Sequence, residues 1–368
     1  MPYLVMVIVL HRRFTRATLP ALAISLAWPA RAQVVSYDGF EGYGAGAQLE
    51  SGNTSSDGTG RNGGTGWGGA YDVHNPIKDR VLIENRSSSP VNYHNGDIVL
   101  PGGIRALRFY NNADGSYAVR RSMGTVFEAA AGDTLWFSIL FRTADGGASP
   151  QANQDLFQIG FDDSADPASG NPRVSIGSNT LSTTNFPSAC HFFARSTTAP
   201  LSSAFHGSLP ITAATTYLLV GQVRPTGGVY DTVNLFVNPS NPDDPSSPSA
   251  TISAPSGLTT LSHAFIRTAF LDGGDAYVLD EWRIGRDYGS VVGSLRNALE
   301  ILPASVPGGP PTLRWPASLP DVLLETSTTL EPGSWEVVTS PFTLNSGHLH
   351  YSVPMAPGIT RAFYRLRR

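Results

Sequence analysis

The sequence contains little cysteine, lysine or charge. Cys190 is the only cysteine among 368 residues, so the chain cannot form a disulfide within itself, and we expect this thiol to pack as a small buried side chain. Lys78 is the only lysine. Charged residues make up 15% of the chain, against roughly 25% in average soluble domains. Burial must therefore stabilise the fold, beneath a surface of mostly uncharged residues.

The shortage of positive charge excludes one class of partner. The formal net charge is −4, and the cations are nearly all arginines. Proteins that bind nucleic acid need clustered positive charge to meet the phosphate backbone. We therefore expect no nucleic-acid partner.

Long apolar or amphipathic helical stretches are also missing. No convincing helical window precedes about residue 287, and no apolar run approaches the ~20 residues of a membrane-spanning helix. Short segments with period-two alternation follow one another instead, separated by turns rich in the chain's 38 glycines and 28 prolines. The pattern predicts an all-β chain, with early strands at 34–38, 80–84, 104–110, 117–121, 134–142, 156–161, 173–176 and 189–195.

The clearest strand signals lie between residues 215 and 286. Residues 215–239 read as a hairpin, because two alternating runs flank the turn sequence Pro225-Thr226-Gly227-Gly228. Residues 276–285, AYVLDEWRIG, read as a closing strand. The run at 134–142 is apolar on most of both faces and is expected to be a central strand.

These residues carry a resemblance to a known fold family. The order TYLLVGQV, VNLFVNP and LDEWRIG resembles the late strands of concanavalin A-like, laminin-G-like jelly-roll domains of secreted bacterial proteins, with a penultimate hairpin and a final strand. The segment 37–73 resembles the opening of the same domains. The resemblance covers roughly 36–290. It implies an antiparallel two-sheet jelly-roll sandwich, a fold whose members often bind carbohydrate and sometimes act as enzymes.

The N-terminus reads as an export signal. Basic residues at 11–16 precede a short apolar stretch at 17–29, and Ala30-Arg31-Ala32 before Gln33 fits a small-x-small cleavage site. Residues 1–32 are therefore predicted to be a signal peptide. The mature chain would then be extracellular, on the cell surface or in the periplasm, without a membrane-spanning segment.

The remaining chain divides into three parts. We expect the jelly-roll domain at 33–290, a short helix and a Pro/Gly linker at 291–311, and a small C-terminal β domain at 312–368. The last part resembles the short, loosely fibronectin-like β-sandwiches appended to many secreted bacterial proteins.

The common catalytic motifs are missing. The sequence has no Glu-x-Asp-x-x-Glu strand, no Gly-x-Ser-x-Gly elbow and no His-Glu-x-x-His helix. Residues 64–69 match a dinucleotide glycine pattern in form, yet no strand precedes them and no helix follows. Asp280 and Glu281 are neighbours on a strand and point to opposite faces, so they cannot form a glycosidase pair by themselves.

A buried carboxylate is expected at Asp280. Period two places it on one face with Val278, Trp282 and Ile284, which should be the core side. A buried carboxylate needs a partner, and two interpretations stay open. One is a structural Ca²⁺ held by Asp38, Glu41 and Asp280. The other is that Asp280 accepts hydrogen bonds from backbone N–H groups.

Trp67 and Tyr71 form the second candidate site. Both lie in a glycine-rich segment where an aromatic ring could stand free and stack on a sugar. Trp67 could equally close one end of the sandwich. The sequence thus predicts a secreted or cell-surface, non-catalytic protein that binds a polysaccharide or cell-surface glycan. A polysaccharide-degrading enzyme and a purely structural surface protein are the alternatives.

Overall fold

Strands dominate the computed structural model. It describes residues 34–46, 62–74, 81–96, 98–110, 116–143, 156–164, 172–179, 191–196, 205–269, 271, 276–293, 299–304, 309–316, 322–329, 331–339, 341–345, 348–354 and 362–367. Cys190 and the predicted signal peptide lie outside these ranges. Within them the helices are α1 (Tyr288–Val291) and the 3-10 turns η1 (Ala129–Ala131) and η3 (Pro332–Ser334). None of the described helices has the length and hydropathy needed to cross a membrane.

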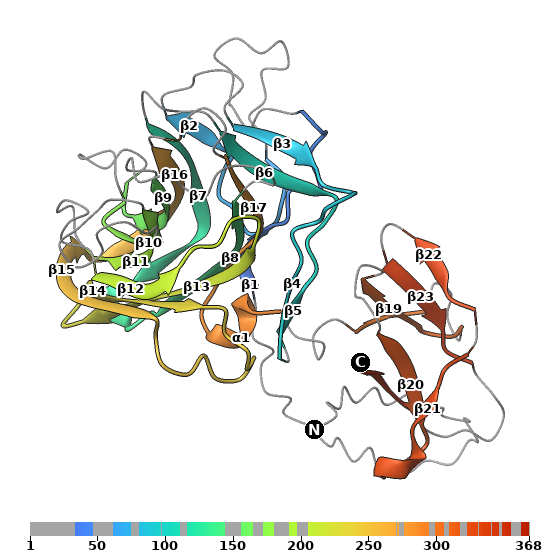
Figure 1. Ribbon diagram of the computed structural model, residues 1–368. Helices are drawn as coiled ribbons and strands as arrows, with labels where there is room; N and C mark the ends of the chain where they lie inside the picture. The colour runs from blue at the N-terminus through green and yellow to red at the C-terminus, as the bar shows by residue number, and fades with distance from the viewer. Residues whose placement is uncertain are drawn as a thin grey trace. The chain divides into compact units, whose positions relative to one another are not determined.

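The chain forms two compact units, and the boundary between them along the sequence lies between Val292 and Gly293. The first unit, Ala32–Val292, contains two antiparallel sheets (Figure 1). The larger sheet has the order β15-β14-β13-β8-β17-β6-β3, and β1 also pairs with β17. Its strands are β1 (Val34–Asp38), β3 (Val81–Asn85), β6 (Arg105–Tyr110), β8 (Leu135–Thr143), β13 (Thr216–Thr226), β14 (Val229–Val237), β15 (Ala250–Leu258) and β17 (Ala276–Gly285).

The second sheet of this unit has seven strands in the order β12-β11-β10-β9-β16-β7-β2. They are β2 (Asp72–His74), β7 (Ser116–Glu128), β9 (Leu156–Asp162), β10 (Val174–Asn179), β11 (His191–Arg195), β12 (Phe205–Pro210) and β16 (Thr260–Ala269). The inner faces of the two sheets share one core, so the unit is the jelly-roll sandwich that the sequence predicts.

Aromatic side chains join the two layers. Phe137 and Phe141 of β8 contact Phe161 and Phe157 of β9, with ring centroids 4.7 and 4.8 Å apart. The other face of β8 is covered as well, because Trp136 packs on Tyr288 of α1 at 5.4 Å. The short hairpin β4 (Tyr93–Asn95) and β5 (Ile98–Leu100) contributes to this second apolar cluster. Both faces of β8 are thus buried, which explains its apolar sequence and confirms it as a central strand.

Two strands that the sequence pattern does not predict, β15 and β16, lie between the hairpin and the last strand. The β13–β14 hairpin lies where predicted, but β15 and β16 follow it, so it is not the penultimate element. β15 contains Pro255 and Gly257, which break a strand pattern and are tolerated because β15 lies at a sheet edge. β16 lies between β9 and β7 in the second sheet.

The second unit, Gly293–Arg368, is built from two small sheets. Their strands are β18 (Glu300–Leu302), β19 (Thr312–Pro316), β20 (Leu323–Ser327), β21 (Glu336–Val337), β22 (Thr343–Asn345), β23 (His348–Ser352) and β24 (Phe363–Arg367). In the segment predicted as helix and linker, 291–311, α1 ends at Val291 and β18 pairs with β19. The β domain therefore begins before residue 312.

Candidate functional site

Asp38 is the centre of a buried ionic network. Its Oδ1 accepts a hydrogen bond from the backbone N–H of Phe40 at 2.9 Å. Its Oδ2 accepts from the hydroxyls of Tyr43 and Tyr71 at 2.7 and 3.0 Å, and from Arg121 Nη1 at 3.1 Å. Asp38 and Arg121 are each 1% exposed. A carboxylate with four donors, one of them cationic, is already satisfied without a metal ion.

Tyr71 and Trp67, which the sequence predicts as a sugar platform, both pack against neighbouring side chains of the same region. Tyr71 is completely buried, and the Arg121 guanidinium lies 4.5 Å from its ring centre. Trp67 is partly buried against Trp282, with ring centroids 4.8 Å apart. Its Nε1 donates to the backbone oxygen of Tyr37 at 3.1 Å. The Tyr71 ring therefore has no exposed face, whereas the Trp67 ring keeps part of its surface exposed.

A β-bulge separates Asp280 from the core face of its strand. The register of β17 against β8 shifts between Asp280 and Arg283, and Glu281 has φ of 55°. Before the bulge, Val278 belongs to the apolar cluster that Trp136 and Tyr288 form on the outer face of β8, which we call the outer cluster beside α1. After the bulge, Trp282 belongs to the core shared by the two sheets. The extra residue changes which face each side chain occupies. Asp280 is buried as predicted, but it does not share a face with Trp282.

Asp280 is held by backbone donors, as the second interpretation expected. Its Oδ2 accepts from Gly103 N–H at 3.1 Å, and its Oδ1 accepts from Glu281 N–H at 2.8 Å. Glu41 lies close by, with Oε1 accepting from Arg105 N–H at 2.8 Å. Burial first, then the charges of Glu281 and Glu41, raise the pKa of Asp280 well above its usual range. Burial also raises the pKa of Glu41.

The three predicted calcium ligands, Asp38, Glu41 and Asp280, therefore do not form one site. Glu41 and Asp280 approach one another, whereas Asp38 bonds to Arg121. Among the residues that the structure describes, no group of three His, Cys, Asp or Glu side chains is arranged to hold a metal ion.

A different set of side chains lies on the seven-stranded sheet, on the side away from the shared core. In β9, Phe157, Ile159 and Phe161 enter the core, so Gln158 between them points the other way. Residues paired in register lie on the same face of the sheet, so the partners of outward-pointing residues in the neighbouring strands also point outward. We call the resulting set the polar face: Gln158, Ser175, Asn179, His191, Arg195 and Arg267.

Gln158 lies at the middle of the polar face and is incompletely bonded. It pairs in register with Arg267 on one side and Gly177 on the other. Its Nε2 donates to Ser175 Oγ at 2.8 Å, while its Oε1 has no hydrogen-bond partner. The side chain is 0% exposed. Whichever way the amide is turned, one of its two ends stays open.

Two arginines lie beside this amide. Arg195 pairs in register with Ser175 and is 3% exposed. Arg267 is partly buried, and no hydrogen bond or ion pair joins it to another described residue. Burial, and then the positive charge of Arg195, lower the pKa of Arg267 to about 10. Burial also lowers the pKa of Arg195 and of His191, so the imidazole is neutral at neutral pH.

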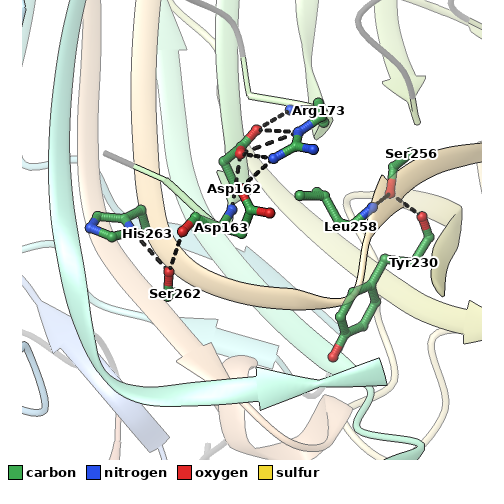
Figure 2. A network of polar contacts seen from close by, with 8 residues as sticks. All are labelled: Asp162, Asp163, Arg173, Tyr230, Ser256, Leu258, Ser262 and His263. Carbon is green, nitrogen blue, oxygen red and sulfur yellow. Dashed lines mark hydrogen bonds and ion pairs between the residues drawn. The ribbon is translucent and has the colours of Figure 1, made fainter. Parts of the chain in front are cut away.

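The carboxylates at one end of this sheet surface already have a cation. Figure 2 shows Arg173 reaching both Asp162 and Asp163, with a contact of 3.1 Å from Arg173 Nε to Asp162 Oδ2. His263, in register with Asp162, contacts Ser262 Oγ through Nδ1 at 2.9 Å. Both carboxylates thus pair with Arg173.

Sequence reasoning did not select the polar face, although a weak signal was present. Gln158, Arg195 and Arg267 are single polar residues within the otherwise apolar runs LFQIG, FFAR and AFIR. One such residue in a strand is unremarkable on its own. The sheet brings the three together from strands far apart in sequence.

Comparisons with known proteins return only distant likenesses. No protein-family model matches the chain, and no curated protein matches it. An alginate lyase in complex with an alginate tetrasaccharide is 13% identical, with coverage of 70% of this chain and 98% of that one and a TM-score of 0.40. Peanut lectin with a bound peptide is 13% identical, with coverage of 58% and 96% and a TM-score of 0.33. The globular domain of T. cruzi calreticulin is 12% identical, with coverage of 59% and 84% and a TM-score of 0.35. These values are too low to transfer a ligand or a reaction.

Proposed function

We propose that the chain is an exported carbohydrate-binding protein that holds a polysaccharide on its polar face. The open end of the Gln158 amide supports this proposal most directly. A buried polar group without a partner costs about 1–3 kcal/mol. A ligand that supplies the missing partner recovers that free energy.

Sugar hydroxyls suit this position for a physical reason. A hydroxyl can both donate and accept, so it satisfies the open end of Gln158 in either orientation of the amide. Ser175 and Asn179 extend the hydrogen-bonding side chains along β10. Arg267, next to Gln158 in the sheet, is only partly buried, so it is the member of the polar face that a ligand would contact first.

The export part of the proposal is supported by the sequence alone. The basic, apolar and small-residue pattern in residues 1–32 is typical of a secretory signal peptide. A mature chain outside the cytoplasm would meet extracellular or cell-surface glycans.

A pair of glutamine substitutions tests the proposed site. Gln158→Met keeps the size of the side chain and removes its amide, so we expect a loss of affinity of about tenfold for an immobilised polysaccharide. Gln222→Met is the matched control, because Gln222 lies on the other sheet and accepts from Asn234 Nδ2 at 2.7 Å. Binding is measured by affinity electrophoresis across a panel of neutral and acidic polysaccharides.

Two results would contradict the proposal. Failure of the wild-type protein to bind any polysaccharide of the panel would remove the binding function. Equal affinity of Gln158→Met and wild type would remove Gln158 from the site and leave a bound water as the partner of its amide.

Cleavage of the bound polysaccharide is the second candidate function, and His191 favours it. This residue lies on the polar face in register with Asn179, and its lowered pKa keeps the imidazole neutral and able to accept a proton. Release of reducing ends by the wild type, and its loss in His191→Ala but not in His350→Ala, would establish cleavage.

A further inference from the structure

We infer that the polysaccharide is acidic and that one of its anionic groups binds at Arg267, beside Arg195. This inference rests on the proposed function and adds the chemical class of the ligand. It follows from how the cations on this side of the seven-stranded sheet are paired.

Two other arginines on this sheet surface, Arg120 and Arg173, have carboxylates of their own. Arg120 of β7 donates through Nε to Asp72 Oδ2 at 2.6 Å. Arg173 pairs with Asp162 and Asp163. Arg267 stands apart, because no carboxylate among the described residues pairs with it.

The position of Arg267 makes this lack of a counter-ion costly. The side chain is partly buried, so water only partly solvates its charge, and the charge that acts on it most is the cation Arg195. The lowered pKa of Arg267 has the same two causes. An anion held at this place would offset both the desolvation and the repulsion between the two guanidinium groups.

The neighbouring groups select a glycan that carries a carboxylate or a sulfate. A guanidinium binds a planar carboxylate through two parallel hydrogen bonds. Gln158 lies directly beside Arg267 in the sheet, where its open amide end can meet a hydroxyl of the same sugar ring. A uronic acid supplies both groups on one ring.

Attraction by the whole molecule cannot produce the same preference. The formal net charge of the chain is −4, which repels an anionic polymer at long range. A preference for acidic glycans would therefore have to arise locally.

Polygalacturonate and its carboxyl-reduced form provide the test, because the two polymers share a backbone and differ in charge. With the full mature chain, we expect at least about tenfold tighter binding to polygalacturonate than to the reduced polymer, since hydrogen bonds to charged groups are the stronger ones. Added salt should weaken the difference. Affinity is measured by biolayer interferometry on the immobilised polymers.

Arg267→Gln is the site variant, and Arg224→Gln is its control. Arg224 is exposed on β13 of the other sheet, away from the polar face. Both substitutions remove one positive charge, so the two variants have the same net charge. We expect Arg267→Gln to lose about tenfold in affinity for polygalacturonate, whereas Arg224→Gln binds as the wild type does. The melting temperature of Arg267→Gln without ligand should equal or exceed that of the wild type, because the substitution removes a cation that has no counter-ion.

The outcomes separate this inference from the proposed function. Equal binding of the wild type to both polymers would overturn the acidic ligand and leave carbohydrate binding intact. Equal losses in Arg267→Gln and Arg224→Gln would show that charge acts without a site and would also overturn the inference. A wild-type chain that binds neither polymer nor any neutral polysaccharide would overturn both.

Discussion

Two buried aspartates of the first unit have opposite surroundings. Asp38 has a cation and two tyrosine hydroxyls, while Asp280 has backbone N–H donors and two neighbouring carboxylates. The surroundings of Asp280 favour a protonated carboxylate. Burial alone, which the sequence suggested for Asp280, does not distinguish these cases.

The state of Asp280 predicts a pH dependence of stability. Its folded-state pKa is raised above the unfolded value of about 3.9, so the folded chain keeps a proton that the unfolded chain releases. Its contribution is therefore fully present below about pH 3.9 and is lost as the pH rises through the folded-state pKa. Asp280→Asn does not titrate, so the melting temperature of the wild type should fall relative to this variant as the pH rises above about 4.

Melting in EDTA provides the control for calcium at the same residue. A Ca²⁺ ion on Asp280 and Glu41 would stabilise the charged carboxylates, and its removal would lower the melting temperature of the wild type. We expect EDTA to leave the melting temperature unchanged, because Asp38 is bound to Arg121 and the third predicted ligand is missing. A melting difference between wild type and Asp280→Asn that stays constant with pH would contradict the protonated state.

At the scale of elements, the glycine-rich segment 62–71 lies against β1. Thr65 exchanges backbone hydrogen bonds of 2.9 Å with Tyr37, and Gly68 N–H donates to the backbone oxygen of Ser122 at 3.0 Å. The segment therefore connects the first strand of one sheet to β7 of the other. Its glycines allow this close approach of the backbones.

Substitution of Gly66 tests how closely this segment packs against β1. Its φ is +75°, and an added Cβ would lie 1.8 Å from the backbone oxygen of Val35. Gly46 has φ of +76° with nothing within 4 Å, so it isolates the cost of the backbone conformation alone. We expect Gly46→Ala to lower the free energy of unfolding by about 1–2 kcal/mol and Gly66→Ala by about 1–3 kcal/mol more.

Urea denaturation of the two variants measures this difference. Equal losses would show that the segment moves away from β1 without cost, and would contradict its role in joining the two sheets.

At the scale of the whole molecule, the first unit contains its own core. The shared core and the outer cluster beside α1 are formed by residues between Phe40 and Val292. A domain with a complete core can fold alone. The chain 33–292 should therefore melt cooperatively at the temperature of the corresponding transition in the mature chain 33–368.

Differential scanning calorimetry of both chains checks this expectation. A truncated chain that is insoluble, or that melts more than about 5 °C lower, a shift worth roughly 1 kcal/mol or more, would show that the second unit stabilises the first.

The sequence by itself determined the class of the fold and most of its strands. Alternation with period two is a local property, so β8, β13, β14 and β17 could be located from their own residues. The turn sequence Pro225-Thr226-Gly227-Gly228 located the hairpin for the same reason, although Pro225 and Thr226 pair within the hairpin and the turn itself is Gly227-Gly228. The end of the first unit at Val292 lies close to the predicted boundary at residue 290.

The tertiary structure alone decided which side chains meet. The bulge at Glu281 changes which face of the sheet the later side chains of β17 occupy. No local sequence pattern predicts the position of a single extra residue. Asp38 pairs with Arg121, 83 positions away, and does not join Asp280 in a common site. The polar face assembles from β9, β10, β11 and β16, because hydrogen-bonded register, which depends on partners distant in sequence, sets the neighbours of each residue.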